Sequence, residues 1–141
     1  MPLSAREVFD RLITGISESR WQDLADLYAE DAVVDQPFMA PEPARIHGRE
    51  QVRAHFLAAV GLPLELRARN VVVHETGDPE VVVAEFDYDV RNTATRREST
   101  VANVQVLRVR DGLIVATRDY HDHLRLAALS GHAATLAAAL D

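Results

Sequence analysis

The sequence predicts an α+β domain in which helices pack on one face of an antiparallel sheet. Apolar residues recur at helical spacing through the first 60 residues, whereas from residue 65 onward they follow the alternation typical of strands. Helices followed by a meander of long strands indicate a helical layer on a sheet face. The length of 141 residues fits one domain over the whole chain, 1–141.

The composition excludes several classes of function. A formal net charge of -7 argues against nucleic acid and anionic membranes as main partners, because both attract basic surfaces. No apolar segment is long enough to span a bilayer, and the N-terminus lacks the apolar run of a signal peptide, so we expect a cytoplasmic location. The absence of cysteine excludes disulfides and thiol nucleophiles.

Capping signals and periodicity predict three helices in the first half of the chain. Ser4, with Glu7 three residues later, has the spacing of a capping box and begins the first helix. Ser19 and Gln22 repeat this spacing and predict a second helix, and a third begins near Gly48. The apolar face of the second helix, which we expect in the core rather than in a site, comprises Trp21, Leu24, Ala25 and Tyr28.

Strands are predicted by alternation and by the turn residues between them. The segment "DAVVDQPF" predicts a short strand that Pro37 stops, and a proline-containing loop follows over residues 39–45. Asp111-Gly112 predicts a tight hairpin turn before the last strand. The four long strands are expected at residues 65–75, 80–91, 98–110 and 113–121.

The C-terminal tail, from about residue 124 to 141, is rich in leucine and alanine and is predicted to be helical. Asp122 stands just before it and is expected to cap this helix. Ser130-Gly131 is expected to break or kink it.

The segment "TRDYHDH", residues 117–123, carries the strongest chemical signal. Strand alternation places Asp119 and His121 on one face, with Arg118 and Tyr120 on the other. Three interpretations remain open: a catalytic acid–base pair, a metal site that adds His123, and a structural carboxylate bonded to the backbone or to His121. We favour the catalytic pair without a metal or cofactor, because an inward carboxylate is desolvated and suited to proton transfer.

Strand alternation also brings aromatic and amide side chains to the face that carries Asp119. Such a mixture of apolar walls and a few polar groups is typical of a small-molecule site. Asn103 and Gln105 have a second interpretation, in which they satisfy each other inside the sheet. His47 and His55 flank the start of the third helix and are expected at its surface or edge. The residues predicted to contact substrate are Gln36, Phe38, Phe56, Phe86, Tyr88, Asn103 and Gln105.

The opposite face of the sheet carries an apolar stripe. A solvated face would show polar residues at these positions, so the stripe predicts burial against a second copy of the chain, in a homodimer. Its residues are Ala102, Val104 and Val106, extended by Val71, Val73, Val81 and Val83.

Three segments, "LYAEDAVVDQPF", "IHGREQVRAHF" and "GLIVATRDYHD", resemble the nuclear transport factor 2-like superfamily. This superfamily includes ketosteroid isomerases, limonene epoxide hydrolases and SnoaL-like polyketide cyclases. The resemblance covers the chain from Ser4 to about Leu124. It implies a cystatin-like, cone-shaped fold with a strongly curved antiparallel sheet, and a dimer formed through that sheet. Because this fold hosts many activities, chemistry must be compared residue by residue.

The resemblance removes two of these activities. In ketosteroid isomerases a catalytic aspartate precedes the proline that ends the first strand, and Gln36 stands there in this chain. The two oxyanion donors fall at Leu12 and Gln105, so we expect no Δ5-3-ketosteroid isomerase activity. The arginine and second aspartate of limonene epoxide hydrolases fall at Phe86 and Tyr88.

SnoaL-like cyclases have an acid–base aspartate that matches Asp119, and His121 would assist it. The resemblance therefore implies a cofactor-independent isomerase, cyclase or hydratase that acts on a small apolar, aromatic or polyketide-like substrate. The alternative is a module of the same fold that binds a small ligand or a protein without turnover.

Overall fold

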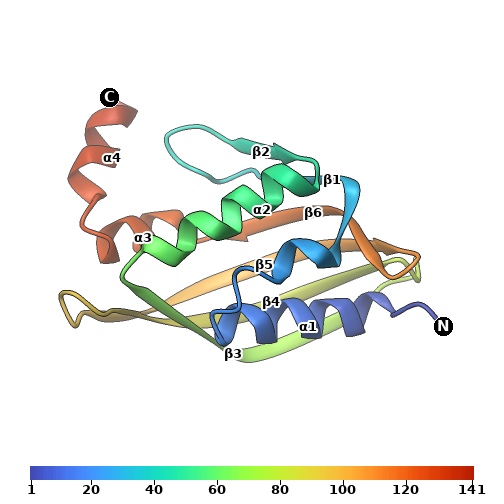
Figure 1. The fold of residues 1–141 in the computed structure, drawn as a ribbon. Helices are drawn as coiled ribbons and strands as arrows, with labels where there is room; N and C mark the ends of the chain where they lie inside the picture. Colours follow the sequence, from blue (N-terminus) through green and yellow to red (C-terminus); the bar gives the residue numbers. More distant parts are fainter.

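The computed structural model describes all residues, Met1–Asp141, and confirms the α+β prediction. One six-stranded sheet, in the order β2-β1-β6-β5-β4-β3, curves around α1 and α2, which cover the same face (Figure 1). β1 and β6 are parallel, and every other neighbouring pair is antiparallel. The elements are α1 (Ala5–Ser17), η1 (Leu24–Leu27), β1 (Tyr28–Gln36), β2 (Ala44–His47), α2 (Arg49–Ala58), η2 (Ala59–Gly61), β3 (Leu64–Glu75), β4 (Val81–Asn92), β5 (Glu98–Arg110), β6 (Leu113–His121), α3 (His123–Leu129) and α4 (Ala133–Leu140).

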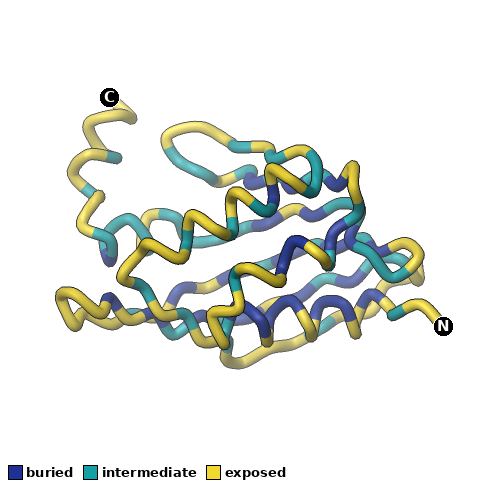
Figure 2. The backbone as a smooth tube through the Cα atoms, viewed as in Figure 1, coloured by how far each residue is buried: buried dark blue, intermediate teal, exposed yellow.

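The core lies between the concave face of the sheet and α1, and the buried residues follow this line in Figure 2. Val8, Phe9 and Leu12 recur at helical spacing and are fully enclosed. The Phe9 ring packs against Phe86 of β4, with centroids 5.6 Å apart. The position of α1 therefore limits the space that is left between α2 and the sheet.

Several local predictions are confirmed. The Ser4 hydroxyl accepts a hydrogen bond from the Glu7 amide at 3.2 Å, and the Glu7 carboxylate accepts one from the Ser4 amide at 3.0 Å. β5 and β6 have the predicted bounds, β3 begins one residue earlier than predicted, and β4 begins and ends one residue later. Asp111 and Gly112 both have positive φ, as a tight hairpin turn of the primed type requires.

The predicted second helix is wrong. Ser19 adopts a left-handed conformation with φ 57°, which ends the helical path after α1. Only one 3₁₀ turn, η1, follows, and the Asp23 side chain before it makes no capping hydrogen bond. Tyr28 begins β1 instead of ending a helix. The strand β2 was also missed, because two prolines precede it within six residues.

The convex face of the sheet carries the predicted stripe in altered form. Val104 and Val106 are half-buried there, and Ala102 is exposed. A bulge between Arg69 and Val72 shifts the alternation of β3. Val72 therefore lies on the outer face, where it lines a groove on the convex side of the sheet. Val71 and Val73 do not line this groove, and Val73 packs against the core.

The tail forms α3 and α4, separated at Ser130-Gly131 as predicted. Gly131 has φ 78°, a conformation that favours glycine. The Asp122 carboxylate accepts a hydrogen bond from the Arg125 amide at 3.0 Å and so caps α3. Leu129 at the end of α3 is buried in the core. No helix combines the length and the apolar composition needed to cross a bilayer.

We expect Asp122→Ala to lower the free energy of unfolding by about 1 kcal/mol, because the first turn of α3 loses its capping acceptor. Asp122→Asn keeps a side-chain oxygen at this position and is the control. Urea unfolding followed by circular dichroism measures both. Equal stability of the alanine variant and the wild type would show that the cap does not hold α3 on the core.

Candidate active site

A small cavity of about 70 Å³ lies between α1, α2 and the concave face of the sheet. Apolar side chains form most of its wall, and polar groups enter from β1, β4, β5, β6 and α2. The residues that line it are Leu12, Ile13, Ile16, Tyr28, Val34, Gln36, Ile46, Val52, His55, Phe56, Phe86, Tyr88, Gln105, Asp119 and His121.

Asp119 is the buried carboxylate of this cavity. The residue is 7% exposed. β5 and β6 pair so that Gln105 lies directly opposite it, and the Gln105 amide donates a hydrogen bond to Asp119 Oδ1 at 2.8 Å. Burial raises the pKa of Asp119 above its ordinary value, and the hydrogen bond from Gln105 offsets part of this rise. A carboxyl group with a raised pKa is a stronger base than an ordinary carboxylate and is suited to accept and return a proton.

His121 follows two residues later and reaches the same cavity. Its Nδ1 lies 2.7 Å from Asn103 Oδ1. The Asn103 amide nitrogen donates to the carbonyl oxygens of Phe86 and Val101, so its oxygen faces the ring and Nδ1 must carry the hydrogen. Nε2 is then left as an acceptor. Burial lowers the pKa of His121 to about 4, which keeps the ring neutral at pH 7.

The structure places both predicted catalytic residues on the cavity but does not pair them. Asp119 is held by Gln105 and His121 by Asn103, and no hydrogen bond joins Asp119 to His121. His121 therefore does not orient Asp119 through a direct hydrogen bond, and any assistance that it gives would act on the substrate. The reason is that the β5 amides lie directly opposite both residues and form hydrogen bonds with them.

The alternate residues of β6 face the other way, as predicted. Arg118 Nε donates to the Tyr120 hydroxyl at 2.9 Å on the convex side of the sheet. Phe38 lies there too, with its ring 5.1 Å from that of Tyr120, and is 66% exposed. Its predicted place in the cavity is wrong, because β1 ends at Gln36 and the Met39 amide bonds back to the Gln36 carbonyl in a turn.

The other predicted contacts divide into two groups. Phe56, Phe86, Tyr88, Gln105 and Gln36 line the cavity. Asn103 is buried but does not line it, and its amide serves the ring of His121 and two backbone carbonyls. The two β5 amides therefore do not satisfy each other.

Tyr28 was expected in the core alone, yet it also lines the cavity beside Tyr88. Burial raises the pKa of both phenols, and the negative charge of Asp119 raises them further. No protein group forms a hydrogen bond with either hydroxyl. Both phenols therefore stay protonated and present O–H donors near Asp119.

His55 is a site residue that the sequence interpretation missed. It projects from α2 with Val52 and Phe56, at spacings of three and four that define one helix face. This spacing indicates from the sequence that His55 can share the inner face of the helix. Burial lowers the pKa of His55, and the charge of Asp119 counteracts this effect.

The metal interpretation had grouped His123 with Asp119 and His121. The rings of His121 and His123 lie edge to face, with centroids 5.7 Å apart. No group of three or more potential ligands in the chain is arranged to hold a metal ion.

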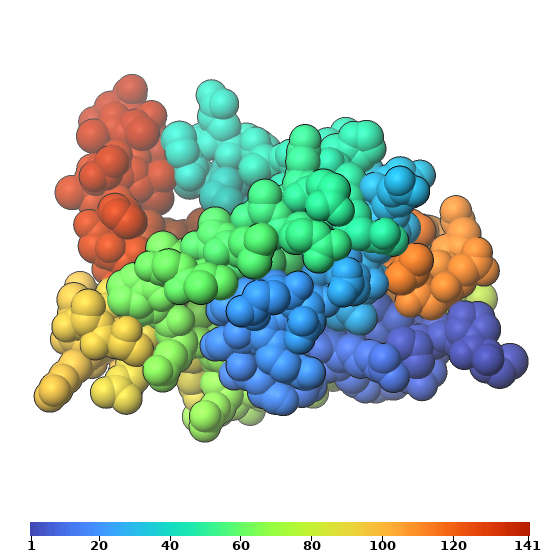
Figure 3. Space-filling model, in the orientation of Figure 1, coloured from blue at the N-terminus to red at the C-terminus, as the bar shows by residue number.

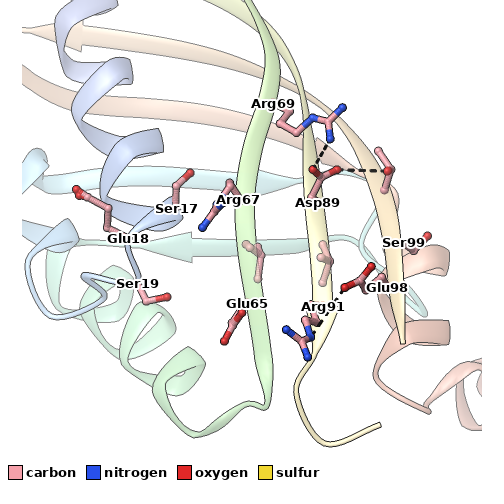
Figure 4. A pocket seen from close by; sticks show the side chains of 13 residues that line it. Ser17, Glu18, Ser19, Glu65, Arg67, Arg69, Asp89, Arg91, Glu98 and Ser99 are labelled. Carbon is pink, nitrogen blue, oxygen red and sulfur yellow. Dashed lines mark hydrogen bonds and ion pairs between the residues drawn. The ribbon is translucent and has the colours of Figure 1, made fainter. Parts of the chain in front are cut away.

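A larger groove of about 820 Å³ lies at the end of α1 and across β3, β4 and β5, and Figure 4 shows its side chains. Its charges are of both signs: Arg69 pairs with Asp89 at 2.8 Å, and Arg91 lies 3.9 Å from Glu98. None of the predicted site residues lines it. The cavity around Asp119 is therefore the better candidate.

Comparisons with known proteins support the fold described above. A family model described as a SnoaL-like domain matches residues 9–117. An uncharacterised PhzA/B-like protein of Pseudomonas aeruginosa is 30% identical over 131 residues, 92% of each chain.

Two solved structures show the same architecture. A candidate isomerase of Bacillus subtilis has a TM-score of 0.83 at 25% identity, over 91% of this chain and 93% of that chain. A candidate polyketide cyclase of Xanthomonas campestris has a TM-score of 0.76 over 89% of this chain and 96% of that chain. At 17% identity, the second likeness shows the fold alone.

The depressed pKa of His121 predicts a loss of stability in acid. Its pKa is about 4 in the folded protein against 6.5 for an ordinary histidine, so between these values the unfolded chain binds the proton more readily. The contribution is fully present above pH 6.5 and is lost as the pH falls toward 4. We expect the free energy of unfolding to fall less between pH 7 and pH 4.5 in His121→Gln than in the wild type, by on the order of 2 kcal/mol. This figure is lower than the full pKa difference implies, because the ring is only partly enclosed.

Urea unfolding at the two pH values measures this difference. Asp119 acts in the opposite direction, but it is present in both proteins and cancels in the comparison. His132 is exposed, so His132→Gln is the matched control. An identical pH dependence in wild type and His121→Gln would contradict the burial of a neutral ring.

Proposed function

Because the chain belongs to the SnoaL-like domain family, in the nuclear transport factor 2-like superfamily that its motifs indicate, we propose that it is a cofactor-independent acid–base enzyme acting on a small, mostly apolar molecule. The reaction class is isomerisation, cyclisation or hydration. The observation that carries this proposal is the enclosed Asp119 carboxyl group, whose pKa is raised and which has no cationic partner. The description of the 25% identical structural neighbour as a candidate isomerase supports the same class.

In the proposed mechanism Asp119 removes a proton from a carbon next to a substrate carbonyl and returns it to a different atom of the same substrate. Gln105 orients the carboxyl group through a hydrogen bond of 2.8 Å to Oδ1. His121 Nε2 is a second acceptor on the same wall and can accept a hydrogen bond from a substrate hydroxyl. Each group has its own support, so one can act as a base while the other orients the substrate.

Tyr28 and Tyr88 supply the electrostatic part of the proposed mechanism. Removal of a proton next to a carbonyl places negative charge on the carbonyl oxygen. Two phenol donors near Asp119, both without protein partners, are suited to stabilise that oxygen. They differ from the positions that carry oxyanion donors in ketosteroid isomerases, which are Leu12 and Gln105 here.

The cavity volume limits the substrate. A volume of about 70 Å³ is well below the 300 Å³ or more of typical ligand pockets. Only a compact molecule fits the cavity in this form. A larger substrate requires outward movement of α2, which contributes Val52, His55 and Phe56 to the wall.

We expect the wild-type protein to catalyse exchange of the α-hydrogens of small neutral ketones, such as cyclopentanone, in deuterated water. Asp119→Asn should lower this rate by roughly 100-fold or more, because an amide cannot accept the proton. Proton NMR of the ketone measures the exchange. The control is Asp122→Asn, which changes a nearby carboxylate that caps α3 outside the cavity.

These outcomes separate the enzyme from the alternative. Exchange at the wild-type rate in Asp119→Asn would remove Asp119 from the mechanism. Ligand binding without exchange by any ketone would favour a binding module that has the same fold and no turnover.

The convex face of the sheet supports a second proposal, a homodimer. A groove of about 530 Å³ there has an apolar floor that includes Phe38, Val72 and Val104. Phe38 and Val72 are 66% and 50% exposed in the single chain. Large exposed apolar side chains that are contiguous on a sheet face are typical of protein interfaces.

We expect light scattering at micromolar concentration to give twice the chain mass of 15.6 kDa. Val104→Glu should give the monomer mass, because it places a carboxylate in the middle of the proposed interface. Ala54→Glu, on the exposed side of α2, is the control and should remain dimeric. A monomeric wild type would contradict the proposal.

A further inference from the structure

The cavity contains no positively charged side chain. Asp119 is its only acidic residue, and none of the lining residues is lysine or arginine. The two arginines of α2 nearest in sequence to His55 are engaged elsewhere. Arg49 donates to the Tyr28 carbonyl at 2.8 Å, and Arg53 pairs with Asp26 and Glu50. A carboxylate or phosphate that entered the cavity would lose its hydration without gaining a counter-ion.

Gln36 differs from the other buried amides of the protein. Asn92 donates to the Leu129 carbonyl, Asn103 to two carbonyls, and Gln105 to Asp119. Gln36 is 4% exposed and lines the cavity, yet its Oε1 has no hydrogen-bond partner. A buried amide oxygen without a partner destabilises the protein, and such an exception calls for a specific explanation.

We propose that Gln36 is a specificity-determining residue that binds a polar group of a neutral substrate, and that the cavity rejects substrates carrying a carboxylate or phosphate. The amide both donates and accepts, so it suits a hydroxyl, carbonyl or carboxamide group. This inference rests on the proposed function, because it assigns the substrate class of the same site. Gln36 contacts the substrate's polar group, while Asp119 acts on its reacting carbon.

The position of Gln36 supports this role. It is the last residue of β1, and β1 pairs directly with β6, the strand that carries Asp119. Both side chains reach one cavity from neighbouring strands. A compact substrate can therefore contact both at once, which fixes its orientation.

The test uses two probes of the same shape and different charge, isobutyramide and isobutyrate. We expect wild-type protein at pH 7 to bind isobutyramide at least about tenfold more tightly than isobutyrate, measured by chemical-shift titration in NMR. Gln36→Leu should weaken isobutyramide binding by about tenfold or more. Without ligand, the same variant should melt about 3 °C higher than wild type, because a buried amide oxygen without a hydrogen-bond partner is removed.

Gln22 is exposed on the surface, so Gln22→Leu is the matched control and should change neither affinity nor melting temperature. Gln36→Met repeats the test with an unbranched side chain. A lower melting temperature in both Gln36 variants, or failure of both to fold, would assign Gln36 a structural role and overturn the proposal. Unchanged isobutyramide affinity in Gln36→Leu would show that the amide binds only water, and tight isobutyrate binding would refute the charge selection.

Asp119→Asn distinguishes this inference from the proposed function. The variant should keep its preference for the neutral probe while losing hydrogen exchange. If exchange persists in Asp119→Asn but Gln36 behaves as expected, the catalytic proposal fails and the selection of neutral ligands stands. If exchange is lost but Gln36→Leu binds normally, the catalytic proposal stands and this one fails.

Discussion

A carboxylate enclosed in an apolar core is stable only if its charge is compensated or if it carries a proton. β6 buries alternate residues against the core, and Asp119 occupies one of the inward positions. The register of β5 and β6 supplies one hydrogen-bond donor, from Gln105, and no cation. The part of the desolvation free energy that this bond does not offset raises the pKa of Asp119. The polar groups of the cavity are arranged around this one constraint.

The same burial moves the two titratable groups of β6 in opposite directions. It raises the pKa of Asp119 and lowers that of His121, because in each case the charged form is disfavoured. Both groups therefore approach the neutral state. The raised pKa makes Asp119 a stronger base toward a substrate, whereas the lowered pKa makes His121 a weaker base that serves as a neutral hydrogen-bond acceptor. Asn103 and Gln105 keep the two apart by binding each separately. A direct Asp119–His121 ion pair would instead have stabilised the charged forms and held the proton in place.

The sequence predicted the parts of the fold that depend on alternation and tight turns. A bulge between Arg108 and Val109 shifts the β5–β6 register by one residue, so counting from the Asp111-Gly112 turn would not pair Asp119 with Gln105. The inward direction of Asp119 followed instead from the local alternation of residues 117–121. Phe38 and Val73 were misplaced because a turn and a bulge break the alternation, and backbone hydrogen bonding decides where such breaks occur. His55 was missed because its role depends on how α2 packs across the sheet, which helical periodicity constrains but does not fix.

β6 serves two surfaces at once, and this links the proposed dimer to the site. Asp119 faces the cavity, while its neighbours Arg118 and Tyr120 lie on the convex face, with Tyr120 in the outer groove. The strand is held on both sides, by β1 and β5, so it cannot move without disturbing the hydrogen bond from Gln105. A partner that packs against Tyr120 would restrict the strand further. Since proton transfer depends on placement to within about 1 Å, such contact would preserve the position of Asp119 even when α2 moves outward to admit a substrate.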